Sequence, residues 1–173
     1  VLNAAVGEIP SIDFSFTGIY NAPTDTALPS VTYGAQATPL VFKNGNTSGF
    51  SLLSYSGALM NITMDVGNSL VYRELVGGSK EVLLTDRAAN GSVTIEAPTI
   101  AQKDYFSAAL TDASLGNLTV THGTAAGNIV RFTSTKVDIG DISYGEADGV
   151  TMLEIPYTLV PSAANDEMVL VFT

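Results

Sequence analysis

The chain has 173 residues, 46% of them hydrophobic, and its 7 Lys and Arg residues against 17 Asp and Glu residues give a formal net charge of -10. Its length suits one main domain with its own core, and its charge disfavours tight binding of nucleic-acid phosphates, although an acidic surface can let DNA slide past without adhering. The sequence contains no Cys, which excludes a disulfide framework and a thiolate metal site or nucleophile, and without a long apolar run we expect no membrane partner.

The first predicted strand lies near the N-terminus, where apolar and polar residues alternate over residues 11–17. Residues 12–17 share a pattern with residues 153–158: apolar residues at alternate positions, an acid between the first two, and a final Thr. If this is a true repeat, residues 1–20 are the terminal strand of a preceding copy of the domain. If the likeness is chance, because alternation is common to all half-buried strands, residues 1–20 form an N-terminal arm.

The next stretch lacks periodicity. Residues 21–48 are rich in Pro, Thr, Ala and Gly, which is typical of a linker or an extended loop. The main domain is therefore expected over residues 49–173.

Short alternating segments recur through the rest of the chain, with Gly, Asn, Asp or Pro at most of the joints between them. This pattern predicts an all-β, mainly antiparallel fold, as a sandwich or barrel. The further strands are predicted at residues 61–66, 80–85, 92–96, 117–121, 129–133, 137–142, 151–160 and 168–173.

One segment, near residues 100–112, predicts a single short helix. Phe106, Ala109 and Leu110 fall on one helical face. Thr99, with Gln102 three residues later, has the pattern of a capping box at the helix start.

Residues 71–80 interrupt the strand pattern with two opposite charges and a Gly-Gly pair. A flexible projecting loop of this kind suits an inter-subunit contact made by Tyr72, Arg73, Glu74 and Leu75. The alternative is an ordinary surface hairpin, in which an exposed ion pair contributes little.

Catalytic chemistry has little support in the sequence. His122 is the single His, and without an identifiable nucleophile or orienting carboxylate it is expected to be structural. We predict no catalytic, cofactor or metal residues, and hence no enzyme.

Four acids cluster at Asp138, Asp141, Glu146 and Asp148. They lack the register of a known calcium loop. We interpret them as solvated acids that can line a lumen or a ring interface.

Several segments together resemble a known family. The succession resembles the second half of the major tail tube proteins of long-tailed, siphophage-type phages and prophages in order and spacing, over nearly the whole chain. The segments are residues 9–25, 71–77, 84–87, 94–98, 122–128 and 162–167.

This resemblance implies a tube domain with two antiparallel sheets packed across one another, one flanking helix and a long hairpin that reaches a neighbouring ring. It implies self-assembly into stacked rings of three or six chains, contacts with other tail proteins, and a lumen through which DNA is ejected without specific binding. The location implied is the phage tail in the virion, after assembly in the host bacterial cytoplasm.

Two other classes of function have less support in the sequence. A carbohydrate-binding or adhesion β-sandwich usually needs an exposed aromatic platform, but the chain has no Trp and its seven Tyr are scattered. A hydrolase on a β scaffold needs paired carboxylates or a triad, for which only generic Asp and Glu are present.

Overall fold

The computed structural model describes residues 1–31, 34, 37–111, 115–163 and 165–173. Its elements confirm the prediction of an all-β, mainly antiparallel fold with one short helix. None of the helices that the structure describes is long and apolar enough to cross a membrane. In chain order the elements are β1 (Leu2–Ala5), β2 (Ser11–Ile12), β3 (Thr47–Leu52), β4 (Leu59–Asp65), β5 (Asn68–Glu74), β6 (Lys80–Arg87), β7 (Asn90–Glu96), α1 (Tyr105–Ala109), β8 (Gly116–His122), β9 (Val130–Ile139), β10 (Ser143–Ala147), β11 (Val150–Leu159) and β12 (Val169–Phe172).

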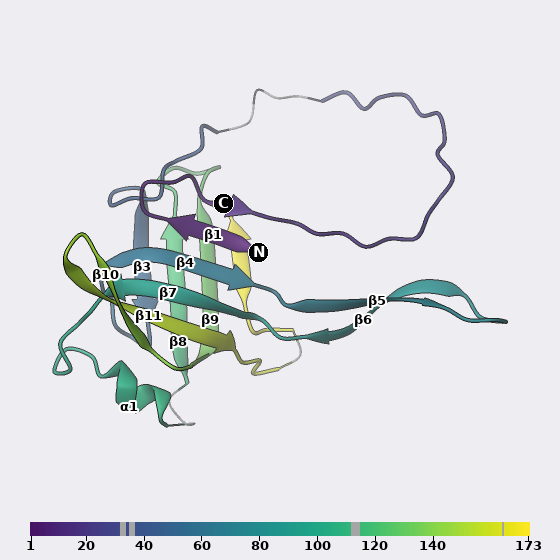
Figure 1. Cartoon of the computed structure of the whole chain (residues 1–173). Coiled ribbons are helices and arrows are strands. Elements are labelled where there is room, and N and C mark those ends of the chain that lie inside the picture. The colour runs from purple at the N-terminus through teal and green to yellow at the C-terminus, as the bar shows by residue number, and fades with distance from the viewer. Residues whose placement is uncertain (32–33, 35–36, 112–114, 164) are drawn as a thin grey trace.

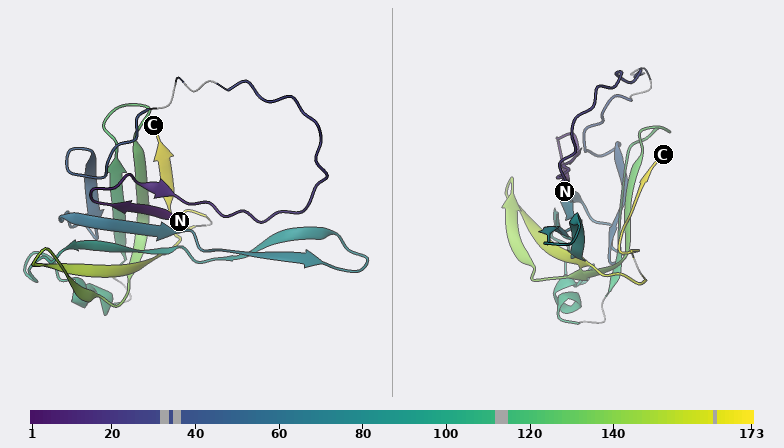
Figure 2. Two further views of the ribbon diagram at one scale, coloured as in Figure 1. Left: turned by 45° about the horizontal axis from the view of Figure 1, so that its top comes forward. Right: turned by 90° about the vertical axis from the view of Figure 1, so that its right-hand side faces the viewer.

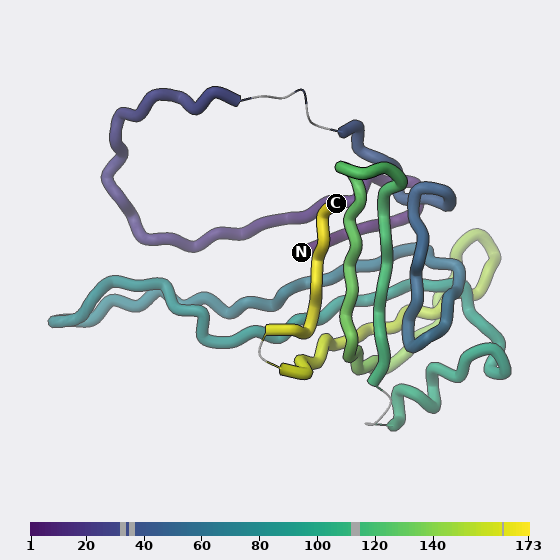
Figure 3. Tube along the Cα trace, turned by 180° about the vertical axis from the view of Figure 1, so that it is seen from behind, coloured from purple at the N-terminus to yellow at the C-terminus, as the bar shows by residue number. Residues whose placement is uncertain are grey.

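The main sheet is continuous but folds into two layers that cross each other (Figures 1 and 2). The first layer has the order β2-β1-β4-β7-β11, and β10 pairs with β11. The second layer contains β9, β8 and β3, with β12 on the other side of β9, and is seen from behind in Figure 3. The layers join where β11 pairs with β9, at Tyr157 opposite Ile139. This arrangement agrees with the expected packing of two sheets.

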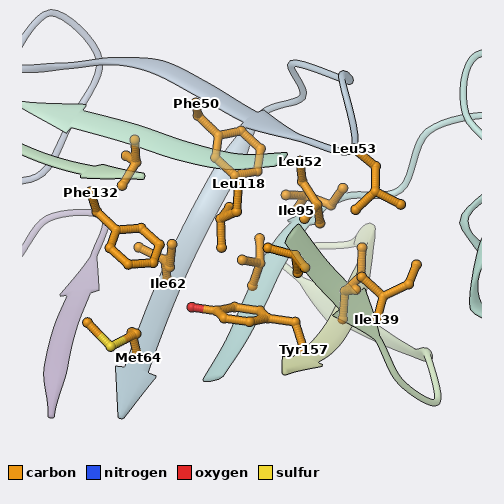
Figure 4. Close-up of a cluster of buried hydrophobic side chains, with 14 of the residues drawn as sticks. Phe50, Leu52, Leu53, Ile62, Met64, Ile95, Leu118, Phe132, Ile139 and Tyr157 are labelled. Carbon is orange, nitrogen blue, oxygen red and sulfur yellow. The ribbon is translucent and has the colours of Figure 1, made fainter. Parts of the chain in front are cut away.

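The core lies between the two layers and follows from the alternation in the strands (Figure 4). In the first layer, Ile62, Val93 and Ile155 lie opposite one another on β4, β7 and β11, and all three are buried. Leu118 and Phe132 contribute from the second layer. Burial of each such side chain contributes about 1.5–3 kcal/mol, so the core supplies most of the stabilisation of the domain.

The helix is shorter than predicted and begins later. Asp104 is its N-cap, with Oδ1 accepting from the Ser107 amide at 2.9 Å. The predicted capping pair does form, since the Thr99 amide donates to Gln102 Oε1 at 2.9 Å, but it closes a turn ahead of the helix.

The predicted apolar face of the helix was wrong at one position. Leu110 is 88% exposed, whereas Tyr105 is fully buried and its hydroxyl donates to the Leu52 carbonyl at 3.1 Å. The helix is anchored by Tyr105, because that side chain begins the helix and points between the layers. Asp112, at the predicted end, lies outside the described residues.

The N-terminal residues join the main sheet. β1 pairs with β4 and β2 pairs with β1. Between β2 and Asn44, the described residues contain no helix or strand, and the chain makes the wide loop seen in Figure 1. The division of the chain at residues 1–20, 21–48 and 49–173 stays a prediction.

Candidate assembly surfaces

The most prominent feature is the hairpin formed by β5 and β6, which projects well beyond the two-layered body (Figures 1 and 2). All seven residues of β5 are exposed. The projecting loop expected over residues 71–80 is therefore the distal part of a longer two-stranded ribbon. The turn at its tip uses Gly77, with φ of 78°, and the Gly78 amide donates to the Leu75 carbonyl at 3.1 Å.

The charges near the tip are paired across the two strands. Glu74 lies opposite Lys80 and accepts from its Nζ at 2.7 Å. Arg73 lies opposite Glu81 at an Nη1–Oε1 distance of 3.9 Å. The two opposite charges seen in the sequence thus bind residues of the facing strand rather than each other. Sequence analysis missed Lys80 and Glu81 as partners because the pairing depends on the hairpin register.

Tyr72 completes this polar group, since its hydroxyl donates to Glu74 Oε2 at 2.8 Å. The hydrogen bond from Lys80, followed by that from Tyr72, lowers the pKa of the Glu74 carboxyl. The same contact with Glu74 raises the pKa of Tyr72. Three of the four predicted contact residues, Tyr72, Arg73 and Glu74, are therefore positioned on one strand by bonds internal to the hairpin, and Leu75 begins the turn.

Apolar side chains occupy both faces of the ribbon. Leu70 lies opposite Leu84 and Val71 lies opposite Leu83, so the two pairs point to opposite sides. Leu70, Val71 and Leu84 are 43%, 48% and 56% exposed, and Val76 at the tip is fully exposed. A two-stranded hairpin without a core is marginal in water, and contiguous exposed apolar residues mark contact surfaces. Leu70, Val76 and Leu84 were not predicted as contact residues from the sequence. The signal that could have identified them is a run of apolar residues without alternation.

Side-chain contacts connect the base of the hairpin to the body. Arg87 forms an ion pair with the buried Glu167 and donates to Asn165 Oδ1 at 3.0 Å. Gly67 has φ of 63°, and a Cβ built there would lie 2.2 Å from the Ala88 carbonyl oxygen.

The outer face of the first layer is a second candidate surface. Thr94 and Glu154 lie opposite each other and next to the buried pair Val93 and Ile155, so they point away from the core. The strands β1, β2, β4, β7, β10 and β11, all within the described part of the chain, contain no Lys or Arg. Their acids are Asp65, Glu96, Glu146 and Glu154. This face is therefore neutral or negative.

The four acids predicted from the sequence are all exposed and lie on different elements. Asp138 lies on β9 opposite Thr158, Asp141 lies in the loop before β10, Glu146 lies on β10, and Asp148 forms the β10–β11 turn with φ of 52°. Among the described residues, no group of three or more His, Cys, Asp or Glu side chains could hold a metal ion.

His122 connects the loop that precedes β3 to β8. One ring nitrogen, Nδ1, lies 2.9 Å from Thr47 Oγ1, and the other, Nε2, lies 3.1 Å from the Leu40 carbonyl oxygen. The ring also packs near Phe42, with 5.7 Å between ring centroids. Both nitrogens are engaged in structural contacts, as expected for a structural His.

Comparison with known proteins places these surfaces in context. Residues 1–159 match the model of a family described as "Phage tail tube protein". No curated protein matches the chain. A solved structure described as "Tail of empty GTA particle computed with helical refinement, C6 symmetry" is 20% identical, with 68% of this chain and 83% of that chain covered and a TM-score of 0.36.

Proposed function

Because this chain belongs to the phage tail tube protein family, and is thus a structural protein of a virion tail, we propose that its copies form stacked rings around a lumen for DNA. The rings contain three or six chains, and assembly takes place in the cytoplasm of the bacterial host. Other tail proteins cover the two ends of the stack.

The observation that carries the proposal is the β5–β6 ribbon with its exposed apolar faces. It extends well beyond its own body (Figure 2). In a stack, the ribbon docks on a neighbouring ring and buries Leu70, Val71 and Leu84. Tyr72, Arg73, Glu74 and Leu75 form the distal part of this contact. The internal ion pairs let the ribbon dock without burying unpaired charges.

The outer face of the first layer supports the electrostatic part of the proposal. A wall whose strands lack Lys and Arg in the described chain offers DNA phosphates no cations, so counterion release cannot anchor the DNA. Glu96 and Glu154 lie on this wall, and Asp138 lies on the same side opposite Thr158. Asp141, Glu146 and Asp148 lie at the β10 end of the layer, where we place a ring interface. DNA passes without specific binding.

No enzymatic role is assigned in this proposal. The one His is held by structural contacts on both ring nitrogens, and a tube wall requires only shape, charge and pairing. Membership of the tail tube family also decides against a carbohydrate-binding or adhesion module.

Electron microscopy of the purified protein, over a series of concentrations, tests the proposal. Rings or tubes with a hollow centre are expected. A variant with residues 70–85 replaced by a short turn is expected to form at most single rings. A protein that stays strictly monomeric at every concentration would count decisively against the proposed assembly.

A further inference from the structure

Two hairpins of this chain can be compared strand by strand. In β1–β2, Leu2 lies opposite Ile12, and in β10–β11, Tyr144 lies opposite Leu153. Both hairpins are antiparallel. When Ile12 is equated with Leu153, Leu2 therefore corresponds to Tyr144.

The second strands of the two hairpins also correspond, although their turns differ in length. Asp148 and Gly149 form a two-residue turn between the paired residues Ala147 and Val150, whereas residues 4–10 separate Asn3 from its partner Ser11. After the turn, residues 12–17 repeat the pattern of residues 153–158 with an acid at the second position and a final Thr. Both segments follow a strand with which they pair in the antiparallel sense, so the likeness extends beyond alternation to the order and direction of the paired strands.

The second strands of the two hairpins differ in burial. β11 is central in the sheet, where Ile155 is fully buried and Tyr157 is 3% exposed. Their counterparts Phe14 and Phe16 are 73% and 89% exposed, with ring centroids 6.1 Å apart. Residues 13–17 therefore have the sequence of a core strand and no sheet around them in this chain.

We propose that residues 2–17 are the last hairpin of another tube-domain unit, in which residues 13–17 take the central place that β11 takes here. In a unit that has its own β11, this place is already filled. The unit that receives residues 13–17 therefore lacks a β10–β11 hairpin of its own, and we place this unit before Val1 in the same polypeptide. Phe14 and Phe16 then enter the core of that unit. The inference rests on the proposed tube function, since it assigns the junction between units of the tube wall.

This assignment also defines how neighbouring units join. The pairing of β1 with β4, with Leu2 opposite Met64, becomes a contact between two units. The edge of β10 that faces away from β11 is unpaired in the described chain. By the same equivalence, this edge pairs with the strand of the next unit that corresponds to β4. Tyr144 then lies opposite the residue that corresponds to Met64. Each junction pairs two open sheet edges, which removes the exposed edge of each unit and continues the first layer from unit to unit.

Hydrogen exchange in intact tails tests the assignment without a mutation. The amides of residues 13–17 are expected to exchange as slowly as those of the non-proline residues in 154–158, and far more slowly than those of the non-proline residues in 24–30. Tails in which residues 13–17 exchange as fast as residues 24–30 would overturn the assignment while leaving the tube function intact.

A photo-crosslinking residue, p-benzoylphenylalanine, at position 16 identifies the acceptor. Its crosslink in assembled tails is expected to lie within one polypeptide, so that the chain runs unchanged on a denaturing gel, and to map upstream of Val1. Crosslinked dimers, or no crosslink, would overturn the proposal. As a second readout, Phe14→Asp with Phe16→Asp is expected to prevent tube formation, whereas Leu28→Asp, at an equally exposed apolar residue of the same loop, is not. Equal behaviour of these two variants would also contradict it.

Discussion

Glu74 and Lys80 face each other as the last register pair of the β5–β6 ribbon, with Nζ and Oε1 2.7 Å apart. The pair joins the two strands at the point where the ribbon would enter a neighbouring ring. It is exposed on both sides, so its removal should matter little to an isolated subunit.

Charge reversal distinguishes a role of these pairs in ring stacking from a role in the stability of the subunit. Glu74→Lys places two cations opposite each other, and Arg73→Glu does the same with two acids at Glu81. We expect shorter tubes or a lower tube yield by electron microscopy, and an unchanged thermal midpoint of the unassembled subunit. The double exchange Glu74→Lys with Lys80→Glu restores the pair and should recover much of the tube yield. Unchanged tube length in both single variants would reject the ribbon as a stacking contact.

The titration of Glu74 provides a direct check on the geometry of the tip. Its carboxyl is expected to titrate below its ordinary pKa of 4.5, because Lys80 and then Tyr72 bond to the charged form. A pKa that is lower in the folded state means that this contribution to stability is present above pH 4.5 and is lost as the pH falls through the lowered value. When the titration of Glu74 is followed by carboxyl NMR, its pKa should rise more in Lys80→Met than in Tyr72→Phe. The reverse order would mean that the ion pair does not form.

Gly67 and Gly77 form a matched pair for testing the base of the ribbon. Both have positive φ, but a Cβ at Gly67 would overlap the Ala88 carbonyl oxygen, whereas a Cβ at Gly77 would meet nothing within 4 Å. Gly77→Ala should lower the free energy of unfolding by about 1–2 kcal/mol through left-handed backbone strain alone. Gly67→Ala should lower it further. Urea denaturation that ranks the two equally would contradict this close contact.

The core anchor of the helix can be tested by two substitutions. Tyr105→Phe removes the hydrogen bond to the Leu52 carbonyl and should cost about 0.5–1.5 kcal/mol of unfolding free energy. Tyr105→Ala also leaves a cavity and should cost about 3–5 kcal/mol. Leu110→Ala, at the residue predicted from the sequence to share the buried face, should change little because Leu110 is 88% exposed.

Charge on the proposed lumen wall can be tested against a control that changes the net charge by the same amount elsewhere in the chain. Glu154→Lys with Glu96→Lys should give tubes that retain DNA in a filter-binding measurement, with retention falling as salt rises. Thr24→Lys, Asp25→Lys and Thr26→Lys together make the same change in net charge on an exposed part of the long N-terminal segment and should give tubes that do not retain DNA. Equal retention by the two variants would place the first layer away from the lumen.

Three strands of the first layer, β4, β7 and β11, were predictable because their residues alternate between the core and the outer face, whereas β1 and β10 were missed and only Ser11–Ile12 of the strand predicted at residues 11–17 forms. Alternation over residues 61–66, 92–96 and 151–160 matches β4, β7 and β11. β3 was missed because a bulge between Ser48 and Ser51 breaks the period, with Gly49 at φ of 63°.

The ribbon and the helix show where local patterns fail. Residues 71–80 were interpreted as a break in the strand pattern because the apolar residues of the ribbon occupy both of its faces and it has no core of its own. Its ion pairs depend on the hairpin register, which the sequence does not show. Similarly, the Thr99–Gln102 pattern was recognised correctly, but Asp104 caps the helix, since the site at which the chain can bury Tyr105 decides where the helix begins.

A three-dimensional reconstruction of the assembled tube tests the account most directly. It should show the β5–β6 ribbon inserted against the next ring, with the outer face of β4, β7 and β11 facing the lumen. A reconstruction in which the ribbon lies free in solvent, or in which the second layer faces the lumen, would contradict the account.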